Sequence, residues 1–132
     1  MSTLRRRDLP LVYSCSGCSA AAQTANTLAV RLDRSYLAEM SCIAGVGGDV
    51  EALVRVARSG RTILAIDGCP LHCTRATLAR QGVTPDVHID LSAHGVRKQP
   101  HQDPDTTQTE NLWHSLIIPV VNLLHGETVR SA

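Results

Sequence analysis

Short apolar runs and longer amphipathic segments alternate along this chain. Apolar runs at residues 9–13, 37–41 and 62–66 each lead into a loop that holds a cysteine. Residues 62–66 are the clearest strand, because an unbroken β-branched and aliphatic series is typical of a strand covered on both faces. Residues 86–91 alternate apolar and polar side chains, which predicts a half-buried strand nearer the sheet edge.

Between and after these strands, apolar side chains recur three and four positions apart, which predicts helices. The helical segments are residues 20–33, 50–57, 71–80 and 111–124. We expect Asp49 to cap the second helix after a glycine-rich turn, and Pro119 to kink the last one. Strands alternating with helices predict an α/β fold in three layers, with a mostly parallel sheet of about four strands and flanking helices. Right-handed crossovers then bring the C-terminal ends of the strands to one rim.

The length of 132 residues suits one domain, which we expect to span residues 1–132. Within it we predict a basic tail at 1–8, a flexible polar loop at 99–110 and a C-terminal helix at 111–124. The net charge is only +1 and aromatic residues are 2% of the chain, which argues against nucleic-acid binding. The late apolar run at 116–124 is too short to cross a bilayer, so no membrane insertion is expected.

Cysteine usage is the strongest chemical signal in the composition. The five cysteines are Cys15, Cys18, Cys42, Cys69 and Cys73. Their number is odd and no cleavable signal peptide is visible, so we expect a cytoplasmic, reduced protein rather than a disulfide-stapled one. In that compartment clustered cysteines more often serve metal or redox chemistry.

The spacing of the cysteines predicts that they meet in the fold. Cys15, Cys42 and Cys69 lie 27 residues apart, about one strand–helix unit, and each follows a predicted strand. They should therefore lie on the rim where open parallel sheets bind ligands. Cys18 and Cys73 add second thiols three and four residues after their partners, a spacing typical of metal sites.

Several functions remain open at this point. Four thiolates suit a tetrahedral zinc ion, and a fifth thiol hints at metal handling or sensing. Thiolate-rich sites equally suit an iron–sulfur cluster for electron transfer or redox sensing. A thiol–disulfide enzyme with Cys15 or Cys69 as nucleophile is a further hypothesis, so the sequence does not decide whether the chain is an enzyme. Buried cysteines can also be simple packing residues.

For four other side chains near these cysteines we expect structural or electrostatic roles rather than catalysis or metal ligation. We expect Asp67 to cap the following helix or bind loop amides. His72 and His94 are expected to be loop residues that face solvent. Arg75 would add positive charge to the site if it faced the thiols.

Three cysteine motifs together resemble one known family. Residues 15–19 (CSGCS), 42–48 (CIAGVGG) and 65–73 (AIDGCPLHC) resemble the DGC-domain family of zinc-binding proteins, and residues 95–98 resemble a later segment of that family. The resemblance implies a cysteine-ligated metal, with Cys15, Cys18, Cys69 and Cys73 as ligands and Cys42 as a fifth matching position. A shorter similarity to the iron–sulfur small subunit of nickel–iron hydrogenases keeps a cluster open as the cofactor.

Overall fold

The computed structural model describes the backbone of residues 5–131 and the side chains of residues 5–125. Its centre is a four-stranded sheet in the order β2-β1-β3-β4, with every pairing parallel. The strands are β1 (Leu11–Ser14), β2 (Glu39–Met40), β3 (Ile63–Asp67) and β4 (Val87–Asp90). The predicted α/β class is confirmed, and β4 lies at an edge as its alternating pattern indicated.

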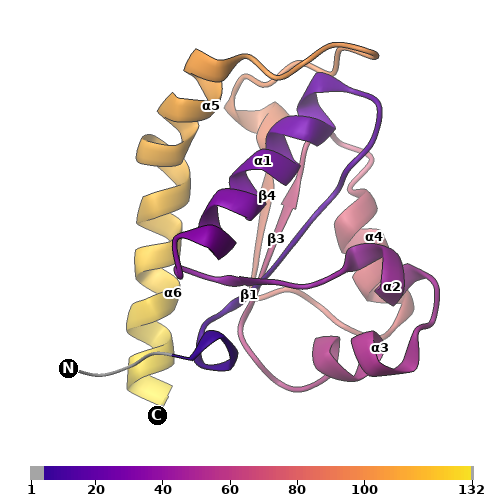
Figure 1. Ribbon diagram of the computed structural model, residues 1–132, viewed down its shortest axis with the longest axis vertical. Coiled ribbons are helices and arrows are strands. Elements are labelled where there is room, and N and C mark those ends of the chain that lie inside the picture. Colours follow the sequence, from indigo (N-terminus) through magenta and orange to yellow (C-terminus); the bar gives the residue numbers. More distant parts are fainter. Residues whose placement is uncertain (1–4, 132) are drawn as a thin grey trace.

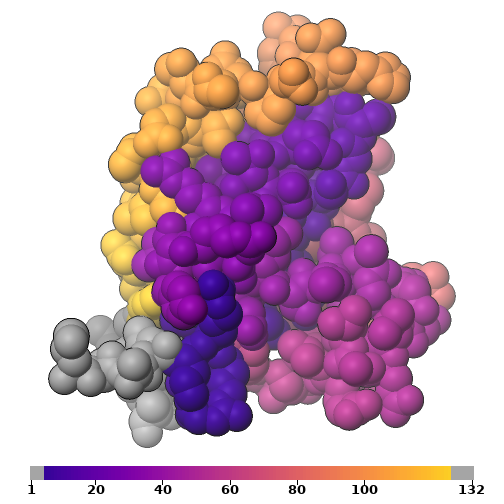
Figure 2. Space-filling model, in the orientation of Figure 1, coloured from indigo at the N-terminus to yellow at the C-terminus, as the bar shows by residue number. Residues whose placement is uncertain are grey.

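Helices cover both faces of the sheet (Figure 1). One face carries α1 (Ala20–Arg34) and the C-terminal helices, and the other carries α2 (Ile43–Gly47), α3 (Glu51–Ala57) and α4 (Cys73–Arg80). The space-filling view shows α1 between the C-terminal helix and the α2–α3 segment on one side of the molecule (Figure 2). The three-layer arrangement follows from strands that are apolar on both faces.

Side chains of the two central strands alternate between two separate cores. Val12 of β1 and Leu64 of β3 point to the α1 side, whereas Tyr13 and Ala65 point to the α4 side. This is the period of two that an extended strand imposes. The same alternation places Asp67 at the end of β3 and His88 of β4 on the side of the sheet that faces α4.

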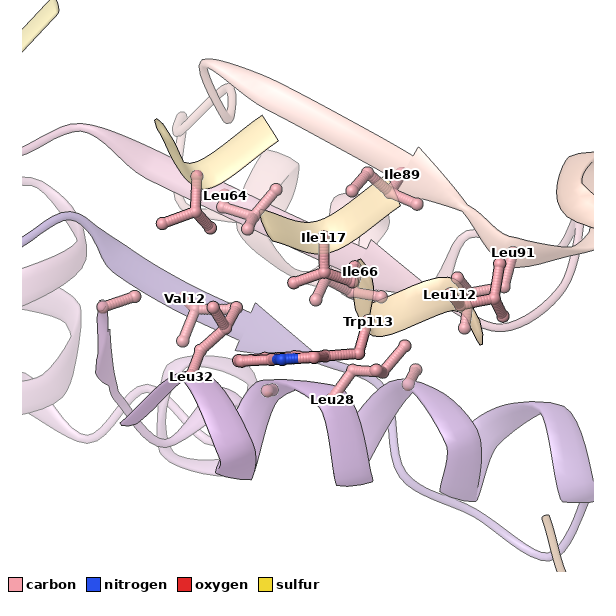
Figure 3. Packing of buried hydrophobic residues seen from close by; sticks show 14 of the residues in the cluster. Val12, Leu28, Leu32, Leu64, Ile66, Ile89, Leu91, Leu112, Trp113 and Ile117 are labelled. Carbon is pink, nitrogen blue, oxygen red and sulfur yellow. The ribbon is translucent and has the colours of Figure 1, made fainter. Parts of the chain in front are cut away.

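Trp113 is the largest side chain in the core beneath α1, in a chain that has no phenylalanine. Its ring lies against Leu28 and Leu32 of α1 (Figure 3). The guanidinium of Arg31 stacks 4.3 Å from the ring centroid and pairs with Glu110 at 2.6 Å. The single tryptophan therefore joins the C-terminal helices to the rest of the domain.

The C-terminal helices begin earlier than the sequence indicated. They are α5 (Thr106–Leu112), the π-helical segment η3 (Trp113–Ile117) and α6 (Ile118–Ser131). Asp105 caps α5 by accepting a hydrogen bond from the Gln108 amide at 2.9 Å, so the predicted loop at 99–110 is shorter than expected. Pro119, which has no N–H for the helical ladder, lies in the first turn of α6, two residues after the π-helical segment ends. Within residues 5–131, no helix combines the length and hydropathy needed to cross a lipid bilayer.

The starts of α3 and α4 also differ from those predicted, and the segment before α3 forms an additional short helix. The glycine-rich segment forms the short helix α2, and α3 is capped by the backbone of Val50 without any side-chain cap. Asp49 has a left-handed backbone (φ 59°) and accepts a hydrogen bond from Gln81 instead, so its predicted capping role was wrong. Helix α4 begins at Cys73 because His72 before it is left-handed.

The predicted basic tail is only partly visible in the described residues, because residues 1–4 lie outside them. Arg6 lies in η1 (Arg6–Asp8), where its guanidinium stacks 4.1 Å from the centroid of the Tyr36 ring. The same guanidinium pairs with Asp33 at 3.1 Å. Arg6 therefore packs against the end of α1 rather than extending into solvent.

Candidate metal centre

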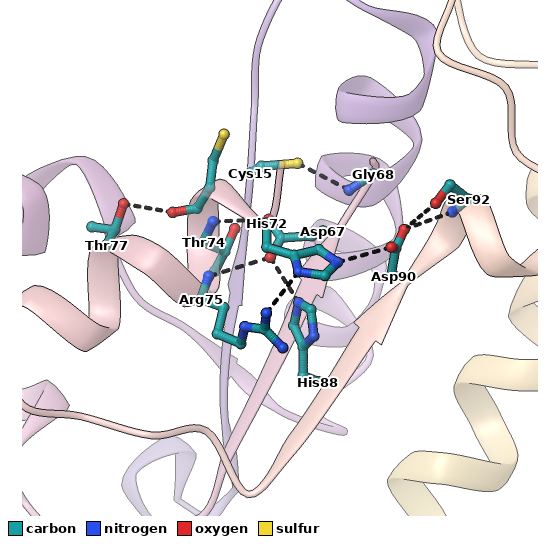
Figure 4. Close-up of polar contacts among 11 residues, drawn as sticks. Cys15, Asp67, Gly68, His72, Thr74, Arg75, Thr77, His88, Asp90 and Ser92 are labelled. Carbon is teal, nitrogen blue, oxygen red and sulfur yellow. Dashed lines mark hydrogen bonds and ion pairs between the residues drawn. The ribbon is translucent and has the colours of Figure 1, made fainter. Parts of the chain in front are cut away.

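The first and third cysteine motifs follow neighbouring strands. Ser14 of β1 pairs with Ile66 of β3, and the Cys15 amide continues the ladder by donating to the Ile66 carbonyl at 3.2 Å. The two loops therefore leave the sheet side by side. Across the gap between them, the Gly68 amide donates a hydrogen bond to the Cys15 sulfur at 3.3 Å (Figure 4).

Four of the five predicted ligands line one cavity of about 230 Å³ at this rim. They are Cys15, Cys18, Cys69 and Cys73. Cys15 and Cys69 are half-buried, whereas Cys18 and Cys73 are exposed. Cys42 does not line this cavity and is the exposed N-cap of α2.

The thiols surround the cavity without converging on one point. Among the described residues, no group of three or more Cys, His, Asp or Glu side chains is placed to hold a metal ion. The donor chemistry nevertheless fits a soft metal, because four sulfurs from two loops share one partly enclosed space.

Gly68 holds the third cysteine motif directly against the main chain of α1. A Cβ added there would lie 2.4 Å from the Ala21 carbonyl oxygen and 2.8 Å from the Ala22 nitrogen, both main-chain atoms of α1. Only glycine allows this approach. Gly68, the middle residue of the Asp67-Gly68-Cys69 motif, therefore lets the third cysteine motif pack against α1, the helix that follows the first cysteine motif.

Burial raises the pKa of the Cys15 thiol to about 11, outweighing the Gly68 amide hydrogen bond that lowers it. The negative charges of Asp67, Cys73 and Cys69 raise this pKa further. Without a bound metal, Cys15 is therefore a neutral thiol near pH 7. Metal binding here would release its proton.

A third segment, residues 98–101, borders the cavity. The Ala20 amide donates to the Gln99 carbonyl at 2.9 Å, and the His101 amide donates to the Cys18 carbonyl at 2.8 Å. These bonds hold Lys98 beside the thiols, where it lines the cavity. Sequence reasoning matched residues 95–98 to a family segment without giving Lys98 a role.

Asp67 acts as the helix cap that the sequence predicted. Its carboxylate is buried and accepts hydrogen bonds from the amides of Thr74 at 2.8 Å and Arg75 at 3.2 Å. A third bond, 2.8 Å long, comes from Nε2 of His88 on β4. The sequence analysis missed His88, although strand alternation places it on the face that also carries Asp90.

His72 was expected to be a loop residue facing solvent, but its side chain is largely covered and has two partners. Arg75 can only donate, so Nδ1 of His72 accepts from it at 2.8 Å and Nε2 donates to Asp90 at 2.8 Å (Figure 4). Arg75 therefore points to the histidines and does not line the thiol cavity. His94 is exposed at the end of η2 (Leu91–His94) and is also absent from the cavity lining.

Asp90 balances burial against several donors. Burial raises the pKa of its carboxyl group, but the hydrogen bonds from Ser92 and His72 together lower the pKa by more. The net pKa therefore lies below its ordinary value. Asp90 is therefore a carboxylate near neutral pH and a firm acceptor for His72.

A model of the DGC domain matches residues 11–116, which contain all five cysteines and the three segments around the cavity. The chain belongs to the DGC-domain family. This DGC-domain protein is 62% identical over 108 residues to the anaerobic and virulence modulator AnvM of Pseudomonas aeruginosa strain PAO1, a match that covers 82% of each chain. No solved structure matches it.

Proposed function

We propose that this DGC-domain protein binds zinc through the thiolates of Cys15, Cys18, Cys69 and Cys73. The observation that carries the proposal is that these four thiols, from two loops far apart in sequence, line a single cavity. Four sulfurs are a complete tetrahedral set for zinc, which would supply a redox-inert cation that ties the loops together. The thiols must turn toward a common point on binding; Cys15, Cys18 and Cys69 lie in loops, and Cys73 is the first residue of α4.

Two neighbouring groups support a thiolate centre. The Gly68 N–H already points at the Cys15 sulfur and would stabilise its anionic form. Lys98 supplies a positive charge at the cavity wall. Four thiolates and one divalent ion leave a net charge of −2, which this lysine partly offsets.

An iron–sulfur cluster is the second candidate, favoured by the separation of the thiols. Zn–S bonds of about 2.3 Å require the four sulfurs to close around one atom. The thiols instead line the wall of a partly open cavity of about 230 Å³ and do not meet at one point. A cluster has several metal atoms, so it would bind four separated thiolates with less movement of the ligands than a single ion.

We infer a regulatory role linked to oxygen supply from the similarity to AnvM, whose name describes an anaerobic modulator. Thiolate centres are suited to this role because oxidation of the sulfurs releases the metal. We place the protein in the reducing cytoplasm, where the cysteines remain available as ligands. A thiol–disulfide enzyme, with Cys15 or Cys69 as nucleophile and Cys18 or Cys73 as resolving thiol, is the remaining alternative. Burial keeps the Cys15 thiol neutral, which favours Cys69 as the nucleophile.

Purification without oxygen followed by elemental analysis tests the proposal. One zinc per chain in a colourless protein supports the zinc centre. Iron, inorganic sulfide and visible absorption support the cluster. Protein that contains neither metal, and that fails to bind added zinc under reducing conditions, contradicts both candidates. Thiol–disulfide exchange by that metal-free protein would favour the enzyme.

A further inference from the structure

We infer that Asp67 and His88 are positioning residues that hold the loop carrying Cys69 and Cys73 in its metal-binding geometry. The inference rests on the proposed metal centre and deepens it. Neither side chain lines the thiol cavity, so both would act through the loop rather than on the metal.

The Asp67 carboxylate closes the loop at both ends. It stands at the end of β3, is 1% exposed, and binds the amides of Thr74 and Arg75 in the first turn of α4. Residues 68–72 are thereby enclosed between a strand end and a helix start. Cys69 lies within this loop, and Cys73 is the residue immediately before Thr74.

His88 fixes the orientation of that carboxylate from a second strand. Its Nε2 donates to the same Asp67 oxygen that accepts from the Arg75 amide. The His88 ring meets the His72 ring edge to face, with centroids 4.7 Å apart and an interplanar angle of 82°. His72 is itself held by Asp90, so β4 supports the loop at two places.

In known metal sites, outer-shell hydrogen bonds orient the ligating side chains. Here Asp67 and His88 orient the main chain that carries two of the thiols. Loss of an outer-shell partner in such sites typically lowers metal affinity by about 10- to 100-fold. The first two residues of the Asp67-Gly68-Cys69 motif then have separate tasks. Asp67 clamps the loop, and Gly68 allows its close approach to α1.

The test compares His88→Leu with His88→Gln in the full-length protein. His88→Gln keeps an N–H donor for Asp67, whereas His88→Leu removes it. Zinc affinity is measured by competition with a chromophoric chelator under reducing conditions. We expect His88→Leu to bind zinc about 10- to 100-fold more weakly and His88→Gln to stay within about threefold of the original protein.

Asp86→Ala is the matched control for general loss of stability. The Asp86 carboxylate accepts from the Ile63 amide at 2.7 Å, at the end of β3 opposite the thiols, and alanine removes this acceptor. This variant should lose stability but keep its zinc affinity. An equal loss of affinity in Asp86→Ala and His88→Leu, or unchanged affinity in His88→Leu, would overturn the inference and leave the metal centre in place.

Hydrogen exchange in the metal-free protein separates this inference from the proposed function. His88→Leu should lose protection at the Thr74 and Arg75 amides, and His88→Gln should keep it. An original protein without zinc affinity would contradict the proposed function, whereas unchanged amide protection in His88→Leu would contradict the clamp itself.

Discussion

The Gly68 amide donates a hydrogen bond to the sulfur of Cys15 over 3.3 Å, across 53 positions of sequence. This bond joins the first and third cysteine motifs directly. It exists because β1 and β3 are neighbouring parallel strands that end in register. The thiols of the candidate centre thus lie together because β1 and β3 are adjacent in the sheet. A change at the contact between the two loops should therefore alter the position of the thiols.

Substitution of Gly68 by alanine tests the close approach of the third cysteine motif to α1. The added Cβ would meet main-chain atoms of Ala21 at 2.4 and 2.5 Å, so backbone must move. We expect Gly68→Ala to lower the free energy of unfolding by about 1–3 kcal/mol. Urea unfolding measures this change.

Gly17→Ala is the control for that substitution. The same methyl group at Gly17 would lie 3.8 Å from the Ala22 side chain, an ordinary contact. It should change the free energy of unfolding by less than about 0.5 kcal/mol. Equal effects at the two glycines would contradict the tight contact at Gly68.

Lys98 should strengthen metal binding through its charge. We expect Lys98→Gln to weaken zinc binding by about two- to fivefold, because an exposed charge contributes only about 0.2–1 kcal/mol. The effect should shrink as salt is added. Arg97→Gln is the control, since Arg97 is exposed and does not line the thiol cavity. Equal affinities of the two variants would show that Lys98 has no electrostatic role.

Packing of α1 against the C-terminal helices should provide much of the stability. Leu28 is fully buried in the core that contains Trp113, so Leu28→Ala should cost about 2–5 kcal/mol. Leu123 is 71% exposed, and Leu123→Ala should cost less than about 0.5 kcal/mol. The fluorescence of the single tryptophan reports both unfolding curves, and similar midpoints would contradict this core assignment.

Asp33 should make the protein sensitive to acid. Burial raises the pKa of its carboxyl group, but the Met40 amide, Arg34 and Arg6 lower it more, so the net pKa in the folded state is below 3.8. A lowered folded pKa stabilises the protein above the unfolded pKa of about 3.9, and this stability is lost as pH falls toward the folded pKa.

The comparison of Asp33→Asn with the original protein measures that contribution. Asp33→Asn should be less stable by about 1–3 kcal/mol at pH 7, and the difference should narrow below about pH 4. Glu51→Gln is the control, because the Glu51 side chain is 91% exposed. A stability difference that stays constant from pH 7 to pH 3 would contradict the role of the Asp33 charge.

Regular features of the sequence were sufficient to predict the sheet and the rim. Three apolar runs and one alternating segment marked the four strands, and the interval between Cys15 and Cys69 matched one strand–helix unit repeated twice. Asp67 was predicted as a cap because aspartate is a preferred capping residue and this one precedes a predicted helix. These are local or periodic signals, which sequence carries directly.

Features that depend on contacts between distant segments could not be read in this way. Lys98 enters the cavity through main-chain bonds of residues 99–101 to the Cys18 loop, and main-chain bonding leaves no side-chain pattern. The pairing of His88 with Asp67 requires the order of β3 and β4. Cys42 shares the sequence interval of the other motifs, yet β2 has only two residues and leads directly to the cap of α2.

The metal content of Cys69→Ser and Cys42→Ser, prepared together without oxygen, tests the central claim most directly. Cys69 lines the cavity and Cys42 does not, while both changes replace one sulfur by oxygen. The account predicts that Cys69→Ser loses most of its bound metal and that Cys42→Ser retains the stoichiometry of the original protein. Full metal content in Cys69→Ser, or equal loss in both variants, would contradict it.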